Sequence, residues 1–186
     1  MKMDRFARGR AQDTFAEHAL TPDENLADNT ISTSWARCSS FGLNPAGKPV
    51  DAVTSNTELC EIIQENQHIR KFVLPELELL YNQIAGTNFM VAYADTRGVV
   101  LDALLDEEFK KSDAGKAVIP GSIWTENYRG TNALGLALHS GASQIVAGQD
   151  HFFRKLGNLS CFAAPIYGQD DQIVGVIDAT SDAASR

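Results

Sequence analysis

The sequence predicts an α+β fold with a central antiparallel sheet, flanking helices and an N-terminal helical extension. Helical and strand patterns alternate along the second half of the chain, and neighbouring strand candidates are joined by short hairpin turns. A length of 186 residues and a hydrophobic content of 44% suit one compact domain beside the extension. We expect the extension over residues 1–54 and the domain over 55–186, with a long entry helix at 55–85 and the sheet and loops at 88–181.

The N-terminal extension is predicted to hold two helices. A weakly patterned helix is expected over residues 4–18, because Pro22 stands just beyond it. A second helix is expected over residues 31–41 and ends at Gly42, since the prolines that follow cannot continue it.

The entry helix begins with a capping-box signal at Ser55 and Glu58. Pro75 removes an amide and clashes with the preceding turn, so we expect a kink or break near residues 73–76. The apolar stripe is longer than one face of a small sheet requires, so we expect part of it to meet a second copy in a homodimer. Its apolar residues recur at three- and four-residue steps: Leu59, Ile62, Ile63, Ile69, Val73, Leu77, Leu80 and Ile84.

The first hairpin is predicted at residues 89–104. Strands at 89–94 and 99–104 flank the turn Asp95-Thr96-Arg97-Gly98, and a short helix is expected over residues 107–112.

The segment from Trp124 to Ala137 pairs a helix-start signal with glycines. Gly130 can turn the chain at positive φ, and Thr131 or Asn132 can cap the orphan amides of the helix that follows. The apolar stripe of that helix is narrow and consists of Ala133, Leu134, Ala137 and Leu138.

The remaining strands are predicted at residues 143–147, 161–167 and 172–180, with the last two joined by a turn at 168–171. We expect helices on one face of the sheet. Loops at 118–130 and 149–160 are expected to cover the other face.

Charge and cysteine usage exclude several classes of protein. A formal net charge of −8 argues against direct nucleic-acid binding by this chain, which needs clustered cations. Three cysteines without paired spacing predict reduced thiols in the cytoplasm rather than a disulfide framework or zinc site. The N-terminus lacks the apolar segment of a secretory signal peptide, and no apolar run is long enough to span a membrane.

Five motif blocks resemble the sensory GAF domain of sigma-54-dependent transcriptional activators of the acetoin-catabolism regulator type. They appear in the order of that family and cover roughly residues 30–181. The blocks are Ser34-Trp35-Ala36-Arg37-Cys38, Gly130-Thr131-Asn132-Ala133-Leu134-Gly135, Gly148-Gln149-Asp150-His151-Phe152, Cys161-Phe162-Ala163-Ala164-Pro165-Ile166 and Gly175-Val176-Ile177-Asp178.

The resemblance implies a GAF-like fold and a sensor that controls a catabolic operon by binding a small alcohol, ketone or related metabolite as inducer. Regulators of this type follow the sensor with an ATPase module and a helix-turn-helix end. The printed sequence contains neither a Walker motif nor a basic recognition helix, so sigma-54 RNA polymerase is expected to be contacted only through parts outside this chain.

Two other functions stay open: a GAF module that docks a metabolic enzyme subunit, and a free-methionine-sulfoxide reductase. No nucleophile motif accompanies His151, so no catalytic residue is predicted. Cys161 is expected to be a small buried hydrophobe, and His139, His151 and Cys161 lack the spacing of metal ligands. No cofactor or metal is predicted.

The ligand site is predicted where two loops meet, with aromatic walls and two hydrogen-bonding groups, Asn132 and His151. Arg129 is the one nearby candidate for holding a phosphate, so we expect a small neutral metabolite rather than a nucleotide. The predicted ligand-binding residues are Trp124, Tyr128, Asn132, His151 and Phe153.

Overall fold

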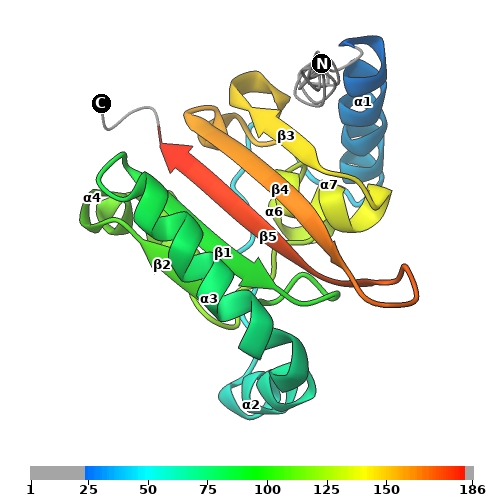
Figure 1. Cartoon of the computed structure of the whole chain (residues 1–186). Helices are drawn as coiled ribbons and strands as arrows, with labels where there is room; N and C mark the ends of the chain where they lie inside the picture. The colour runs from blue at the N-terminus through cyan, green and yellow to red at the C-terminus, as the bar shows by residue number, and fades with distance from the viewer. Residues whose placement is uncertain (1–23, 183–186) are drawn as a thin grey trace, which may run out of the picture.

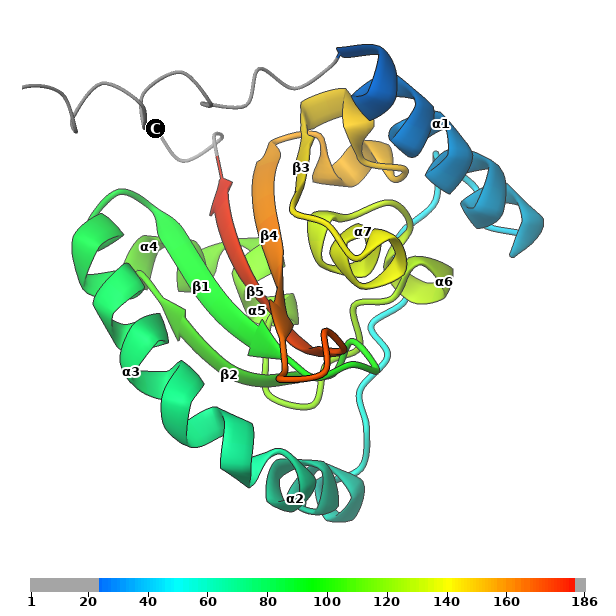
Figure 2. The same cartoon turned by 45° about the vertical axis from the view of Figure 1, so that its right-hand side comes forward.

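The computed structural model describes residues 24–182. The predicted helix at 4–18 lies outside the described residues. Helix α1 spans Glu24–Ser40, so it begins before the expected residue 31, and the chain turns away at Gly42 with φ of 78°. A linker then leads to the domain that Figures 1 and 2 show around a twisted sheet.

All five strands pair antiparallel, in the order β2-β1-β5-β4-β3. The hairpins β1–β2 and β4–β5 confirm the sequence-based prediction to within two residues at each strand end. The strands span Phe89–Ala94 (β1), Val100–Leu105 (β2), Gln144–Ala147 (β3), Leu159–Tyr167 (β4) and Ile173–Asp182 (β5).

Two helices, α2 (Asn56–Glu65) and α3 (Gln67–Ile84), lie on one face of the sheet. The Ser55 side chain caps α2 by accepting a hydrogen bond from the Glu58 amide at 3.2 Å. Arg70 of α3 makes a two-bond ion pair with Asp102 of β2. Helix α3 therefore packs on β1 and β2 (Figure 2).

The expected break near Pro75 is wrong, because the helix is interrupted at Asn66 and α3 continues through Pro75. The Ile62 carbonyl accepts both the Asn66 backbone amide at 3.0 Å and the Asn66 side-chain amide at 2.9 Å, so Asn66 caps the end of α2. Pro75 and the residue four positions before it, Lys71, are exposed. Water can therefore solvate the Lys71 carbonyl that the proline leaves without an amide.

The other face of the sheet also carries helices, which corrects the expectation of helices on one face only. Helix α7 (Ala133–Ser140) packs on β3, β4 and β5. It is apolar on most sides and its first five residues are buried, which explains why it became a core element. Short helical turns complete this layer: α4 (Glu107–Lys111), α5 (Asp113–Ala117), α6 (Glu126–Arg129), η1 (Gly148–Asp150) and η2 (Arg154–Leu156).

The α3 layer leaves the β3–β4 end of its face uncovered. The register places Ile145, Phe162 and Ala179 in one row on that face, in line with Val91 beneath α3. Ile145 is 56% exposed and Phe162 is 42% exposed. An apolar strip of sheet is therefore open to solvent.

A candidate ligand pocket beside Arg129

The first motif block docks α1 onto α6. Arg37 donates through Nε and Nη2 to the two carboxylate oxygens of Glu126, each at 2.8 Å, and Glu126 is only 8% exposed. Ser34 donates to the same carboxylate and lies 2.7 Å from the Thr131 hydroxyl. This polar network links α1, α6 and the turn that starts α7.

The same block meets the segment after β3. Trp35 donates from Nε1 to the Asp150 carbonyl at 2.9 Å, and its ring meets Phe152 edge to face. Phe152 and Phe153 are buried in a small apolar cluster with Cys38. Gly130 has φ of +65° and passes so close that an added Cβ would lie 2.8 Å from the Phe152 Cβ, so only glycine fits there.

Asn132 is the N-cap of α7. Its Oδ1 accepts from the Gly135 amide at 2.9 Å, and its Nδ2 donates to the Gly130 carbonyl at 2.8 Å. The helix start predicted at Thr131 or Asn132 is therefore set by Asn132. Both polar ends of its amide are engaged by the backbone.

His151 is buried against β4. Nδ1 lies 3.2 Å from the Gly148 carbonyl, which can only accept, so Nδ1 carries the proton and Nε2 accepts from the Cys161 thiol at 3.3 Å. Burial lowers the pKa of His151 below its ordinary value. Burial likewise raises the pKa of the Cys161 thiol, so this pair is neutral.

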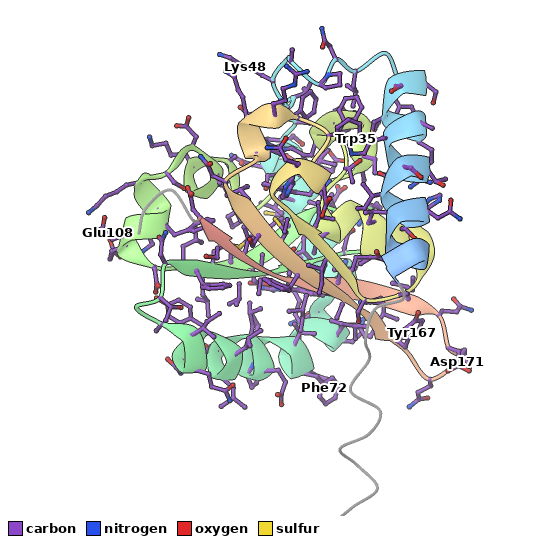
Figure 3. All side chains as sticks on the ribbon, turned by 90° about the horizontal axis from the view of Figure 1, so that it is seen from above. Trp35, Lys48, Phe72, Glu108, Tyr167 and Asp171 are labelled. Carbon is purple, nitrogen blue, oxygen red and sulfur yellow. The ribbon has the colours of Figure 1, made fainter. Side chains whose placement is uncertain are left out.

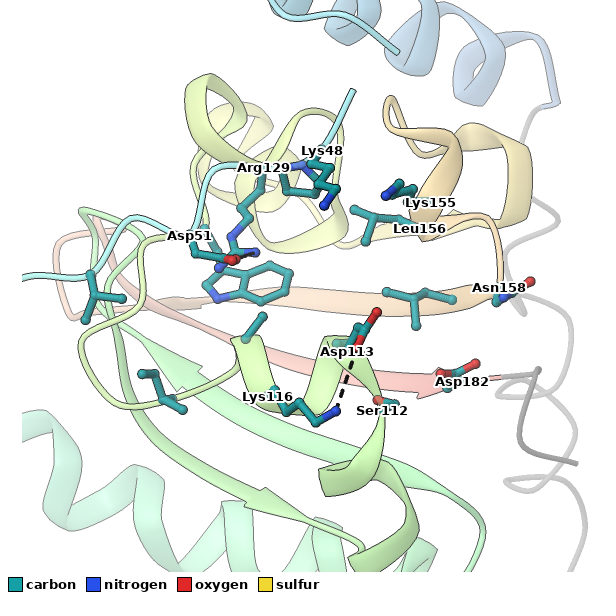
Figure 4. Close-up of a pocket in the computed structure, with 17 residues that line it drawn as sticks. Lys48, Asp51, Ser112, Asp113, Lys116, Arg129, Lys155, Leu156, Asn158 and Asp182 are labelled. Carbon is teal, nitrogen blue, oxygen red and sulfur yellow. Dashed lines mark ion pairs between the residues drawn. The ribbon is translucent and has the colours of Figure 1, made fainter. Parts of the chain in front are cut away.

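A pocket of about 720 Å³ opens elsewhere on the same side of the sheet. The linker 48–53, helix α5 and η2 surround it, and the start of β4 and the end of β5 contribute to its wall. Figure 4 shows charged side chains from these segments gathered around the opening. Its size suits a small organic ligand.

Arg129 forms the most unusual part of this wall. The residue is 3% exposed, and its guanidinium carbon lies 4.5 Å from the centre of the Trp124 ring, in cation–π geometry. Within the described residues, its one polar side-chain contact is an ion pair of 2.7 Å between Nη1 and Asp51, and Nε is buried without a hydrogen-bond partner. Burial lowers the pKa of this guanidinium, which nevertheless stays charged.

Lysines stand at the rim of the pocket. Lys48 and Lys155 are exposed, and neither forms an ion pair within the described part of the chain. Lys116 lies 3.8 Å from Asp113. In the view of Figure 4, Lys48 and Lys155 lie on the same side of the opening as Arg129.

The five residues predicted to bind a ligand do not come together around this pocket. Trp124 lines it, whereas Tyr128, Asn132, His151 and Phe153 do not. Phe153 belongs to the cluster around Cys38, and the half-buried Tyr128 accepts the Val50 amide through its backbone carbonyl.

Sequence reasoning missed the contributions of the linker and α5. It considered Arg129 only as a phosphate contact. The signal available in the sequence was a single arginine, Arg129, five residues after Trp124. The other segments of the pocket wall are far from it in sequence.

Among residues 24–182 no helix is long and apolar enough to cross a membrane. No group of three or more potential ligands in that part of the chain is arranged to hold a metal ion.

Comparisons with known proteins point to one group of regulators. The family model described as "MimR, N-terminal domain" matches residues 6–186. The acetoin dehydrogenase operon transcriptional activator AcoR of Bacillus subtilis is 32% identical over 164 residues, which are 87% of this chain and 27% of AcoR. The propane 2-monooxygenase operon transcriptional activator MimR of Mycolicibacterium smegmatis is 26% identical over 174 residues, which are 92% of this chain and 28% of that protein. The chain thus spans about a quarter of the length of these relatives.

A solved structure shares the fold. This chain matches a chain in the crystal structure of the E. coli DhaR(N)-DhaL complex with a TM-score of 0.78 and 20% sequence identity. The match covers 84% of this chain and 53% of the chain in that complex. This likeness confirms the predicted fold class. The sequence comparisons confirm the resemblance carried by the five motif blocks.

Proposed function

We propose that this chain, which belongs to the MimR N-terminal domain family, is the ligand-sensing module of a transcriptional activator of a catabolic operon. The pocket beside Trp124 and Arg129 is the observation that supports sensing, because it offers space for a small ligand between an aromatic wall and several charged side chains. The relatives are transcriptional activators of an acetoin dehydrogenase operon and a propane 2-monooxygenase operon. The inducer is accordingly a small alcohol, ketone or related metabolite.

The sensor acts on an ATPase and DNA-binding part that lies outside this chain. A ligand can shift the output only if it binds two arrangements of the protein unequally. The linker 48–53 lines the pocket and joins α1 to α2, so it is the element through which occupancy reaches the helices.

Tryptophan fluorescence provides the test, because Trp124 lines the pocket and Trp35 is bonded elsewhere. The Trp35→Phe variant leaves Trp124 as the only tryptophan, and Trp124→Phe is the matched control that keeps Trp35. Titration with a panel of small carbon sources should change the emission of the first variant and leave the second nearly constant. Equal responses of the two variants would place the binding site elsewhere.

The module is proposed to be regulatory rather than catalytic. A reductase needs a reactive thiolate, but Cys38 and Cys161 are buried and burial raises the pKa of both thiols. A triple variant with serine at Cys38, Cys60 and Cys161 should keep its ligand response. Loss of methionine-sulfoxide reduction in that variant, against activity in the wild type, would establish the enzyme instead.

Docking of a metabolic enzyme subunit is the second candidate function, and the uncovered apolar strip at Ile145 and Phe162 favours it. The DhaR N-terminal region in the matching structure is itself in a complex with DhaL. Replacing Phe162 with Lys should then abolish binding of a subunit encoded by the regulated operon and leave small-molecule binding intact. Unchanged binding of the subunit would exclude this strip.

We also propose a homodimer that uses the outer face of α3. Phe72 and Leu79 lie seven residues apart, and are 67% and 53% exposed. Phe72 projects outward from the helix (Figure 3). Val73, by contrast, is buried against the sheet.

A further inference from the structure

The guanidinium of Arg129 has fewer partners than a buried cation normally has. It can donate five hydrogen bonds in a planar fork, yet Asp51 is its one polar side-chain contact within the described residues. Removing a cation from water is costly unless charges and hydrogen bonds replace the lost hydration. The guanidinium in the pocket wall therefore has N–H groups with which it can bind an anion.

The Asp51 partner is attached in a way that allows exchange. Its side chain is 75% exposed, whereas that of Arg129 is 4% exposed, so Asp51 reaches the buried cation from the solvent side. Backbone hydrogen bonds on both sides hold the linker to the core, from the Val50 amide to the Tyr128 carbonyl and from the Ile123 amide to the Ala52 carbonyl. Only the Asp51 side chain needs to turn away for another carboxylate to reach Arg129.

The surrounding charge also favours an anion. The whole chain carries a net charge of −8, yet Lys48 and Lys155 stand unpaired within the described residues at the rim, beside Arg129. Asp113, on the far wall, lies opposite these lysines and near Lys116 (Figure 4). Cations next to a partly enclosed wall attract an anionic ligand.

We propose that the pocket takes a small organic carboxylate, such as a hydroxy or keto acid, whose carboxylate displaces Asp51 and pairs with Arg129. Planar guanidinium and carboxylate groups match in two parallel hydrogen bonds, which Asp51 does not complete. Trp124 supplies the apolar wall for the remainder of the ligand. The inference rests on the proposed sensing function and specifies the inducer as a hydroxy or keto acid in place of a neutral alcohol or ketone.

Isothermal titration of the whole chain tests this proposal with matched probes. Lactate and pyruvate are the acids, and lactamide and acetoin are the neutral counterparts. Lactate or pyruvate should bind at least about tenfold more tightly than either neutral probe, as expected when a charge-assisted pair is gained. Tighter binding of acetoin or lactamide would overturn the carboxylate proposal and leave the sensing function standing, whereas no binding by any of the four probes would overturn both.

Variants separate the two carboxylates that compete for Arg129. Asp51→Asn should tighten the binding of the acid probe about tenfold, because the competing charge is gone, while Asp170→Asn in the β4–β5 turn is the matched control. Arg129→Gln should lose the preference for acids. If that variant fails to fold, the double variant Lys48→Gln, Lys155→Gln provides a second test. It should weaken the binding of the acid probes and leave the binding of the neutral probes unchanged, with Lys71→Gln on α3 as control. Unchanged or weaker acid binding by Asp51→Asn would overturn the displacement.

Discussion

At the residue scale, the motif side chains chiefly organise the backbone. Asn132 illustrates this, because its amide caps α7 and fixes the turn at Gly130. A sequence pattern identifies such a residue as a good cap or as a good ligand contact equally well. Only its partners distinguish the two roles.

Asn132→Ala should lower the free energy of unfolding by about 2–3 kcal/mol, since it removes the cap and leaves the buried Gly130 carbonyl without a donor. Asn132→Asp keeps the acceptor for the Gly135 amide, so its free energy of unfolding should fall by less. Urea unfolding of the three proteins measures the difference. An alanine variant as stable as the wild type would contradict the structural role.

Asp178 is a buried carboxyl on the α7 side of β5. Burial raises its pKa to about 7, although the Thr180 hydroxyl donates to it at 2.8 Å. Because the folded-state pKa exceeds the ordinary value of 3.8, the native state binds more protons than the unfolded state between these values. The stability contribution of this group is complete below pH 3.8 and is lost as pH rises to about 7.

Asp178→Asn should therefore stabilise the protein at pH 8, by at most about 4 kcal/mol, and have little effect at pH 4. The amide keeps an oxygen for Thr180 and carries no charge to bury. Thermal unfolding at the two pH values provides the measurement. Burial lowers the pKa of His151, so this residue makes the opposite contribution: its stabilisation is lost as pH falls below the pKa of histidine in the unfolded chain. His151 is therefore left unchanged in both proteins. An equal shift in Tm at pH 4 and pH 8 would exclude titration of Asp178 as the cause.

At the element scale, strands and turns were predictable and helix interruptions were not. Both hairpins follow from alternating or continuous apolar runs between turn residues, which are local signals. Pro75 gave a false signal for a helix break. The proline lies on the exposed side of α3, where the helix continues through it, and that position depends on packing. The helix interruption lies at Asn66, whose backbone and side-chain amides both donate to the Ile62 carbonyl at the end of α2.

The dimer proposal belongs to α3. Replacing both Phe72 and Leu79 with Glu should convert a dimer to a monomer in sedimentation experiments, because both side chains are exposed on the outer face. Unfolding temperature should stay close to that of the wild type. The stripe predicted from sequence included Ile69 and Val73, but these pack toward the sheet, so their replacement would damage the core instead. A wild-type chain that remains monomeric at high micromolar concentration would contradict the proposal.

At the scale of the whole molecule, the pocket could not be derived from sequence, whereas the family could. The motif blocks record which segments pack together, as in the contacts of Trp35 with Asp150 and Phe152. The pocket wall is assembled from the linker, α5, α6, η2 and two strand ends, and no local pattern connects them. Trp124 was found because it begins the segment that carries the helix-start signal, and Asp51 was missed because it lies between the motif blocks.

The extension should be inseparable from the domain, and truncation tests this. A chain that begins at residue 55 loses Ser34 and Arg37, the partners of the largely buried Glu126 carboxylate, and uncovers Phe152. It should unfold at a lower urea concentration than a chain that begins at residue 24 and keeps α1, with a loss of about 3–5 kcal/mol, as for a broken buried ion pair.

The double variant Ser34→Ala, Arg37→Gln in the full chain should reproduce part of that loss without removing the linker, which separates the polar network from the Asp51 contact. Acid binding is compared only between the double variant and the full chain, because truncation removes Asp51 together with Lys48 from the pocket. If the chain from residue 55 were as stable as the chain from residue 24, α1 would be an independent appendage. In that case occupancy of the pocket could reach α1 only through the linker, and the network at Glu126 would have no part in signalling.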